Sequence, residues 1–209
     1  AFPHLMAWVA ADLPWRSILW VSSALAIAGG AIVALGVRDG PYVSASAPFD
    51  PRAVGQVVSN RGVRLATLGY LGHMWELYAM WAWMPAFAAA SIAAAGVEGT
   101  SGATSSLVAF VAIASGAVGC VMAGRTADAW GKARIAGAAM VVSGSCALAA
   151  GFAFGRPLPV LLIFAVCWGF SIVADSAQLS ALVAEHSTRT HVGTALTLKI
   201  CLGLLLTMI

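Results

Sequence analysis

Long apolar stretches separated by short polar loops dominate this chain. A helix that rises about 1.5 Å per residue needs about 20 apolar residues to cross ~30 Å of hydrocarbon. Stretches of that length without a charged residue occupy 17–37, 104–123 and 135–154. Further stretches, equally apolar apart from isolated ionisable groups, occupy 65–90, 160–184 and 193–209. The pattern predicts an all-α fold, a polytopic membrane helical bundle.

Composition excludes a soluble protein. The chain is 61% hydrophobic and 9% charged, whereas a typical soluble domain has about 25% charged residues. Most of the Lys and Arg residues lie in alternate loops, and positive loops stay in the cytoplasm. We therefore expect an integral, multi-pass protein of the plasma (inner) membrane with these segments cytoplasmic: 38–64, 124–134 and 185–192. The basic residues form no nucleic-acid-binding motif, so no nucleic-acid partner is predicted.

Polar side chains inside the spans are the candidate functional residues, because an ionisable group at bilayer depth is costly and usually faces a cavity or a partner. At helical spacing, one stripe of the second span and one of the fifth join polar groups to an aromatic, Trp83 and Trp168 respectively. We predict that these stripes form the wall of a cavity. The candidate residues for substrate binding or proton coupling are His73, Glu76, Asp175, Gln178 and Lys199.

Structural alternatives exist for these residues. His73 is also suited to an interhelical hydrogen bond, and Asp175 and Lys199 lie at similar depths, so they could form a structural ion pair. Lys199 could instead extend to the membrane interface. Glu76 lies near the midplane, where burial favours the neutral form of a carboxylate that has no partner. With His73 one turn away, Glu76 is the predicted coupling residue.

Other chemistry has little support in the sequence. All four cysteines fall inside apolar spans without metal-ligand spacing, so we interpret them as small core residues and predict no metal, disulfide or cofactor: Cys120, Cys146, Cys167 and Cys201. An HExxH pair, a GxSxG turn and paired intramembrane aspartates are absent, so an enzyme is not predicted. In the third span, small residues recur every four positions and predict close helix packing: Ala112, Gly116, Cys120 and Gly124.

The segment 124–134 (GRTADAWGKAR) resembles the cytoplasmic loop motif of the major facilitator superfamily. The positions that match the motif are Gly124, Asp128, Gly131, Lys132 and Arg134. Residues 69–78 (GYLGHMWELY) and 174–183 (ADSAQLSALV) are also similar to this superfamily, and to the branch that groups nitrate, nitrite and cyanate permeases. Nitrate carriers have a Gly-rich signature with Asn in the eleventh helix, and 193–209 contains no Asn, which argues against nitrate.

The resemblance implies a place in the family's twelve-helix plan. Residues 1–37 would hold the end of the fifth helix and all of the sixth, 38–64 the cytoplasmic central linker, and 65–209 five spans of the C-terminal half, the last one truncated. The loop motif would hold the cytoplasmic face closed. For Asp128 the alternative is a helix cap, since a carboxylate beside the start of the fourth span is stabilised by the helix dipole.

The function implied by the resemblance is secondary active transport of a small molecule or small ion by alternating access, with a proton as a candidate coupling ion. The expected partners are the lipid bilayer, the solute and the missing helices of the same carrier. A truncated fragment that does not transport is the alternative.

Overall fold

The computed structural model describes residues 4–5, 14–38, 51–96 and 102–208. The fold is all-α, as predicted, and the described residues contain no β-strand. The helices are α2 (Trp15–Gly36), α3 (Pro51–Ser59), α4 (Arg61–Ala94), α5 (Gly102–Trp130), α6 (Lys132–Ala153), α7 (Leu158–Ala174), α8 (Ser176–His186) and α9 (Val192–Leu206).

Five helices are long and apolar enough to cross a membrane: α2, α4, α5, α6 and the continuous stretch Leu158–His186 formed by α7 and α8. The sixth predicted span corresponds to α9, which is apolar but has 15 residues. The helix end predicted at 1–11 lies outside the described residues except for 4–5. Helix α4 continues through Pro85, where a kink is favoured on chemical grounds.

The predicted linker contains structure that the sequence did not reveal. Residues Pro51–Ser59 form α3, and α4 begins at Arg61 rather than at residue 65. A helix of nine residues is too short to show a sustained apolar stripe. It is anchored by packing, because Val57 is buried against α4 and α9.

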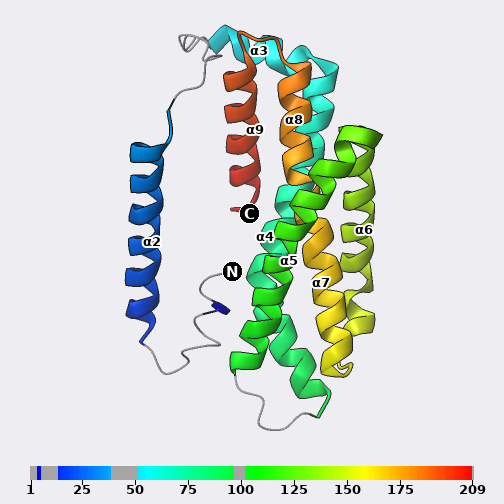
Figure 1. Cartoon of the computed structure of the whole chain (residues 1–209). Helices are drawn as coiled ribbons and strands as arrows, with labels where there is room; N and C mark the ends of the chain where they lie inside the picture. The colour runs from blue at the N-terminus through cyan, green and yellow to red at the C-terminus, as the bar shows by residue number, and fades with distance from the viewer. Residues whose placement is uncertain (1–3, 6–13, 39–50, 97–101, 209) are drawn as a thin grey trace.

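Helices α4 to α9 form one bundle, and α2 stands beside it in Figure 1 without contacting another described helix. The described parts of the three segments predicted to be cytoplasmic lie together, at the top of Figure 1. We call this the basic end, since it carries Arg61, Arg64, Lys132, Arg134 and Arg189. The end of α4, the start of α5 and the α6–α7 connection lie at the opposite end.

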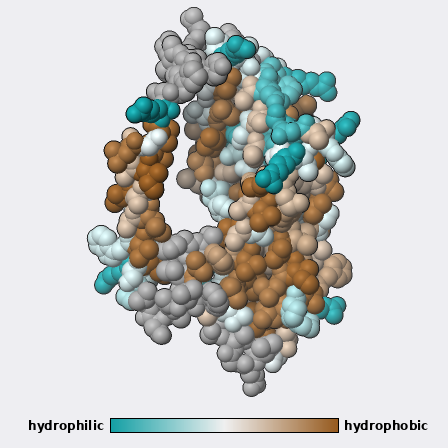
Figure 2. Space-filling model, in the orientation of Figure 1, coloured by the Kyte–Doolittle hydropathy of each residue, from teal (hydrophilic) through white to brown (hydrophobic). Residues whose placement is uncertain are grey.

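The outer surface of the helices is apolar. None of the residues in the apolar window of α2 is buried. Figure 2 shows brown, hydrophobic residues along α2 and the middle of the bundle, and teal, hydrophilic ones toward the ends. Large side chains such as Leu148 and Phe152 are more than four-fifths exposed, at 87% and 81%. Water would not solvate such a surface favourably, whereas hydrocarbon would.

The closest helix pair is α5 with α7, and glycine makes it possible. A Cβ atom on Gly169 would lie 1.8 Å from the Ala112 carbonyl oxygen, and one on Gly119 would lie 2.1 Å from the Phe170 carbonyl oxygen. The predicted packing ridge is therefore confirmed at Ala112 and Gly116. It was wrong at Gly124, which has no neighbouring atom within 4 Å of an added Cβ, and Gly119 belongs to the contact instead.

The helix of the fifth predicted span is interrupted at Asp175, between α7 and α8. The backbone N–H of Asp175 donates to the Val173 carbonyl, two residues back, and the α-helical pattern resumes when Leu179 N–H donates to the Asp175 carbonyl at 2.9 Å. The thiol of Cys120 on α5 donates to the same Val173 carbonyl at 3.2 Å. A backbone group released by the break thus finds a partner on a neighbouring helix, as apolar surroundings require.

Candidate functional site

The break at Asp175 places its carboxylate against His73 of α4. His73 Nδ1 and Asp175 Oδ1 are 2.7 Å apart, and their side chains are 0% and 2% exposed. The two atoms are close enough for an ion pair. The ring N–H is not well aligned with the carboxylate, however, so they do not form a hydrogen bond. The contact is an ion pair only when the imidazole is protonated, so a single proton changes the net charge of the buried pair.

Lys199 of α9 lies in the same interior but does not contact Asp175. Its ammonium donates to Ser180 Oγ of α8 at 2.6 Å and lies 3.9 Å from the centroid of the Tyr70 ring. The rings of Tyr70 and His73 are in turn 5.8 Å apart. The ion pair predicted between Asp175 and Lys199 is therefore wrong: each side chain has a different partner. Lys199 is 2% exposed, so it does not extend to the interface either.

Glu76 contacts α6 and α7, whereas His73 contacts Asp175 at the α7–α8 junction. Its Oε1 accepts a hydrogen bond from Trp168 Nε1 on α7 at 2.9 Å, and its Oε2 accepts one from Ser143 Oγ on α6, also at 2.9 Å. The predicted Glu76–His73 pair is not formed, although the residues are one turn apart. Each carboxylate oxygen has one donor, so Glu76 joins three helices as an interhelical acceptor.

The polar stripes are internal and do not form an open wall. His73, Asp175, Gln178 and Lys199 are between 1% and 4% exposed within the described bundle. Trp83, predicted to share the stripe of α4, is 71% exposed and lies outside it. Apart from the two atoms of the His73–Asp175 contact, three buried nitrogens have no hydrogen-bond partner among the described residues: His73 Nε2, Trp81 Nε1 and Gln178 Nε2. Such groups are uncommon, because an unsatisfied buried donor costs about 1 to 3 kcal/mol.

The motif of 124–134 is located at the basic end. Gly131 joins α5 to α6 with φ of 90°, a conformation that favours glycine. Lys132 forms an ion pair with Glu185 of α8, which the sequence prediction missed. Asp128 lies in the last turn of α5, and the N-cap of α6 has no side-chain hydrogen bond, so the alternative of a helix cap at Asp128 is not formed as a hydrogen bond. Arg134 is exposed in the first turn of α6.

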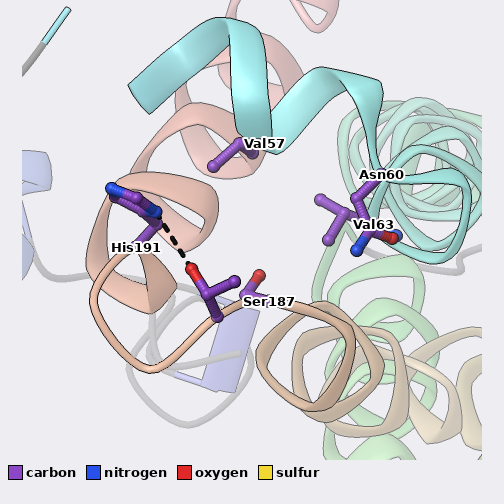
Figure 3. Close-up of a pocket in the computed structure, with 6 residues that line it drawn as sticks. Val57, Asn60, Val63, Ser187 and His191 are labelled. Carbon is purple, nitrogen blue, oxygen red and sulfur yellow. Dashed lines mark hydrogen bonds between the residues drawn. The ribbon is translucent and has the colours of Figure 1, made fainter. Parts of the chain in front are cut away.

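A second connection at the basic end involves Asn60. Its Oδ1 accepts from the N–H groups of Gly62 and Val63 and so caps α4, while its Nδ2 donates to the carbonyl of His186 at the end of α8 at 2.9 Å. Beside it is the small pocket of Figure 3, between α3, the start of α4 and the α8–α9 connection. It is lined by Val57, Asn60, Val63, Ser187, Thr188 and His191. Thr188 Oγ1 and His191 Nδ1 form a hydrogen bond of 2.9 Å, which is the dashed line at His191 in Figure 3.

Cysteines and metals add no site. Cys167 and Cys201 are exposed on the bundle surface, so the interpretation of all four cysteines as core residues was wrong for these two. Within the described part of the chain, no group of three or more His, Cys, Asp or Glu residues could hold a metal ion.

Comparison of the chain with protein-family models, with curated proteins and with solved structures gives no match. The buried polar groups and the contacts at the basic end therefore carry the functional argument.

Proposed function

We propose that this chain is part of a secondary transporter of the major facilitator type, which moves a small solute across the membrane by alternating access. The observation that carries the proposal is the His73–Asp175 pair, because it lies at a helix break in the interior of helices long enough to span a bilayer. A buried ionisable pair is costly in such surroundings. Broken helices with buried polar groups at mid-depth are a common feature of transporter sites.

The pair has the properties that proton coupling needs. Protonation of His73 converts a contact with net negative charge into a neutral ion pair, so the proton changes the cost of keeping Asp175 buried. Lys199 lies one ring away, across Tyr70. We therefore assign the coupling role to His73 and Asp175, and to Glu76 the role of positioning α4 against α6 and α7.

The solute site, in this proposal, lies between the bundle α4–α9 and further helices of the same carrier. The basic end would face the cytoplasm, in keeping with its positive charge. Alternating access would open and close that end, where the Lys132–Glu185 and Asn60–His186 contacts hold α8 to α6 and α4.

Transport is tested by reconstituting the natural protein in vesicles that contain a pH-sensitive dye. We expect one class among small anions, carboxylates, amino acids and sugars to cause a pH change inside the vesicles. Asp175→Asn should abolish this solute-dependent proton movement. Thr197→Val should retain it, because Thr197 is an exposed polar residue of α9 outside the polar cluster. Absence of a response to every class, or a full response in Asp175→Asn, would contradict the proposal.

Orientation is tested separately by labelling single cysteines in a cysteine-free background. Thr190→Cys is exposed at the basic end and Arg156→Cys at the opposite end. In intact cells we expect an impermeant maleimide to label the Arg156→Cys variant and to leave the Thr190→Cys variant unlabelled until the cells are opened. The reverse pattern would place the basic end outside and remove the family placement.

A further inference from the structure

We infer that the pocket of Figure 3 binds the phosphate and glycerol region of an anionic phospholipid, taken from the membrane leaflet at the basic end. The pocket lies outside the buried polar cluster of His73 and Asp175, so lipid binding there is independent of solute transport. Three properties of the pocket point to this ligand: its two-sided lining, its hydrogen-bond donors and the positive charge around it.

The lining of the pocket is partly apolar and partly polar. Val57 of α3 and Val63 of α4 are 5% and 3% exposed and supply the apolar part. In Figure 3 they surround one space together with Ser187 and His191. The space has a volume of about 40 Å³, more than the ~10 to 15 Å³ that one water molecule needs. A free inorganic anion would leave the two valines uncovered, whereas the glycerol carbons of a phospholipid would cover them.

The polar part of the pocket supplies hydrogen-bond donors. Thr188 Oγ1 and His191 Nδ1 share one hydrogen bond of 2.9 Å. If the hydroxyl donates this bond, the neutral imidazole keeps an N–H group at Nε2; if the ring donates it, the Thr188 hydroxyl keeps its O–H group. In both arrangements the pair retains a donor beyond the bond that it shares.

The acceptors beside the pocket are already engaged. The His186 carbonyl at the end of α8 accepts from Asn60 Nδ2 at 2.9 Å. No described carboxylate lines the pocket, and Glu185 on α8 forms an ion pair with Lys132 of α6. A ligand must therefore bring its own acceptors, as the oxygen atoms of a phosphate diester do.

Positive charge flanks the pocket on two sides. Arg64 Nη1 donates to the Val58 carbonyl of α3 at 3.4 Å, so the guanidinium lies at the end of α3, beside Val57. A guanidinium has five N–H groups, and most of these remain for a ligand. Arg189 follows Thr188 in the α8–α9 connection and is exposed. Basic side chains at the membrane surface attract anionic lipids, so we expect an anionic phospholipid here rather than a zwitterionic one.

The test measures lipid binding to the purified, delipidated natural protein by native mass spectrometry. The probes are dioctanoyl phosphatidylglycerol, which is anionic, dioctanoyl phosphatidylcholine, which is zwitterionic, and inorganic phosphate. We expect phosphatidylglycerol to bind at least about tenfold more tightly than phosphatidylcholine, because the choline cation would meet the arginines. Inorganic phosphate at the same concentration should not displace it.

Two variants remove groups of the pocket, and a third is a matched control. Arg64→Gln removes the guanidinium, and His191→Phe keeps a ring but removes its nitrogens. Each should weaken binding of phosphatidylglycerol about tenfold, the usual effect of losing one hydrogen bond to a charged group. Arg125→Gln removes an equal charge from α5, which contacts neither α3 nor α9 in the described bundle. Its affinity should stay within about twofold of the natural protein's.

Equal binding of the two lipids, or an equal loss in Arg125→Gln and Arg64→Gln, would mean general attraction of anionic lipids to the basic end and would overturn the pocket as a lipid site. Unchanged affinity in both Arg64→Gln and His191→Phe would do the same. Displacement by inorganic phosphate would mean that the pocket binds a phosphate ion and not a lipid. Circular dichroism checks the fold of each variant, and where one does not fold, the other decides.

Discussion

Replacement of Gly169 by alanine is expected to disrupt the bundle, whereas the same replacement at Gly144 is expected to leave it intact. The added Cβ at Gly169 would lie 1.8 Å from the Ala112 carbonyl oxygen, which is backbone and cannot rotate away. Helices α5 and α7 would have to separate, which we expect to cost roughly 3 kcal/mol or more. At Gly144, nothing lies within 4 Å of the added atom, and alanine gains about 0.5 to 1 kcal/mol of helix propensity.

Thermal unfolding in a mild detergent, followed by circular dichroism, measures the difference. Gly169→Ala should lower the unfolding temperature strongly or prevent recovery of monodisperse protein, and Gly119→Ala should behave similarly because its Cβ would meet the Phe170 carbonyl. Gly144→Ala should unfold at or slightly above the temperature of the unchanged protein. Equal unfolding temperatures for Gly169→Ala and Gly144→Ala would mean that α5 and α7 are not interlocked.

The spans could be predicted from sequence because their signal is local. The number of residues in an apolar run gives the length of the helix it would form. Comparison of that length with the thickness of the hydrocarbon core identifies the helices that can cross a membrane. The charge-free runs 17–37 and 135–154 correspond closely to α2 and α6. Short or interrupted elements were missed for the same reason. Helix α3 gains its stability from packing of Val57, and the break at Asp175 leaves no Pro or Gly in the sequence to mark it.

The candidate residues could be predicted, but their partners could not. Depth along a helix follows from residue counting. His73 lies 12 residues from Arg61 and Asp175 lies 11 from His186, or about 18 and 17 Å from the basic end, so their depths match. Lys199 lies 7 residues from Val192, about 11 Å deep, and thus matches Ser180. Counting alone also permitted Asp175 with Lys199, because it does not tell which helices are neighbours.

The rotation of each helix about its own axis is the other quantity that could not be predicted from the sequence. His73 and Glu76 are three residues apart and share a broad face, yet one meets the α7–α8 junction and the other meets α6 and α7. A helix in the middle of a bundle has neighbours on several sides, so residues at i and i+3 can reach different ones. The contact of Lys132 with Glu185 was missed similarly, since it joins residues 53 positions apart.

Removal of one partner of the His73–Asp175 pair is expected to lower the free energy of unfolding substantially. Each single loss should exceed half of the loss that follows removal of both partners. Asp175→Asn leaves an imidazole buried without its anion, and His73→Gln leaves a buried carboxylate. Breaking a buried pair from one side typically costs about 3 to 5 kcal/mol, because the remaining group is uncompensated. The double variant removes both groups at once. Its loss of stability should therefore fall short of the sum of the two single losses by at least about 1 kcal/mol.

A second cycle, of Asp175→Asn with Lys199→Met, distinguishes the observed arrangement from an Asp175–Lys199 ion pair. Lys199 donates to Ser180 and lies on the Tyr70 ring, so it shares no atom contact with Asp175. We expect the two losses to add within roughly 0.5 kcal/mol. Chemical unfolding of the natural protein in mixed detergent micelles gives the four free energies of each cycle. Strong coupling of Asp175 to Lys199 together with additivity toward His73 would mean that the carboxylate turns toward α9, and the coupling role would then pass from His73 to Lys199.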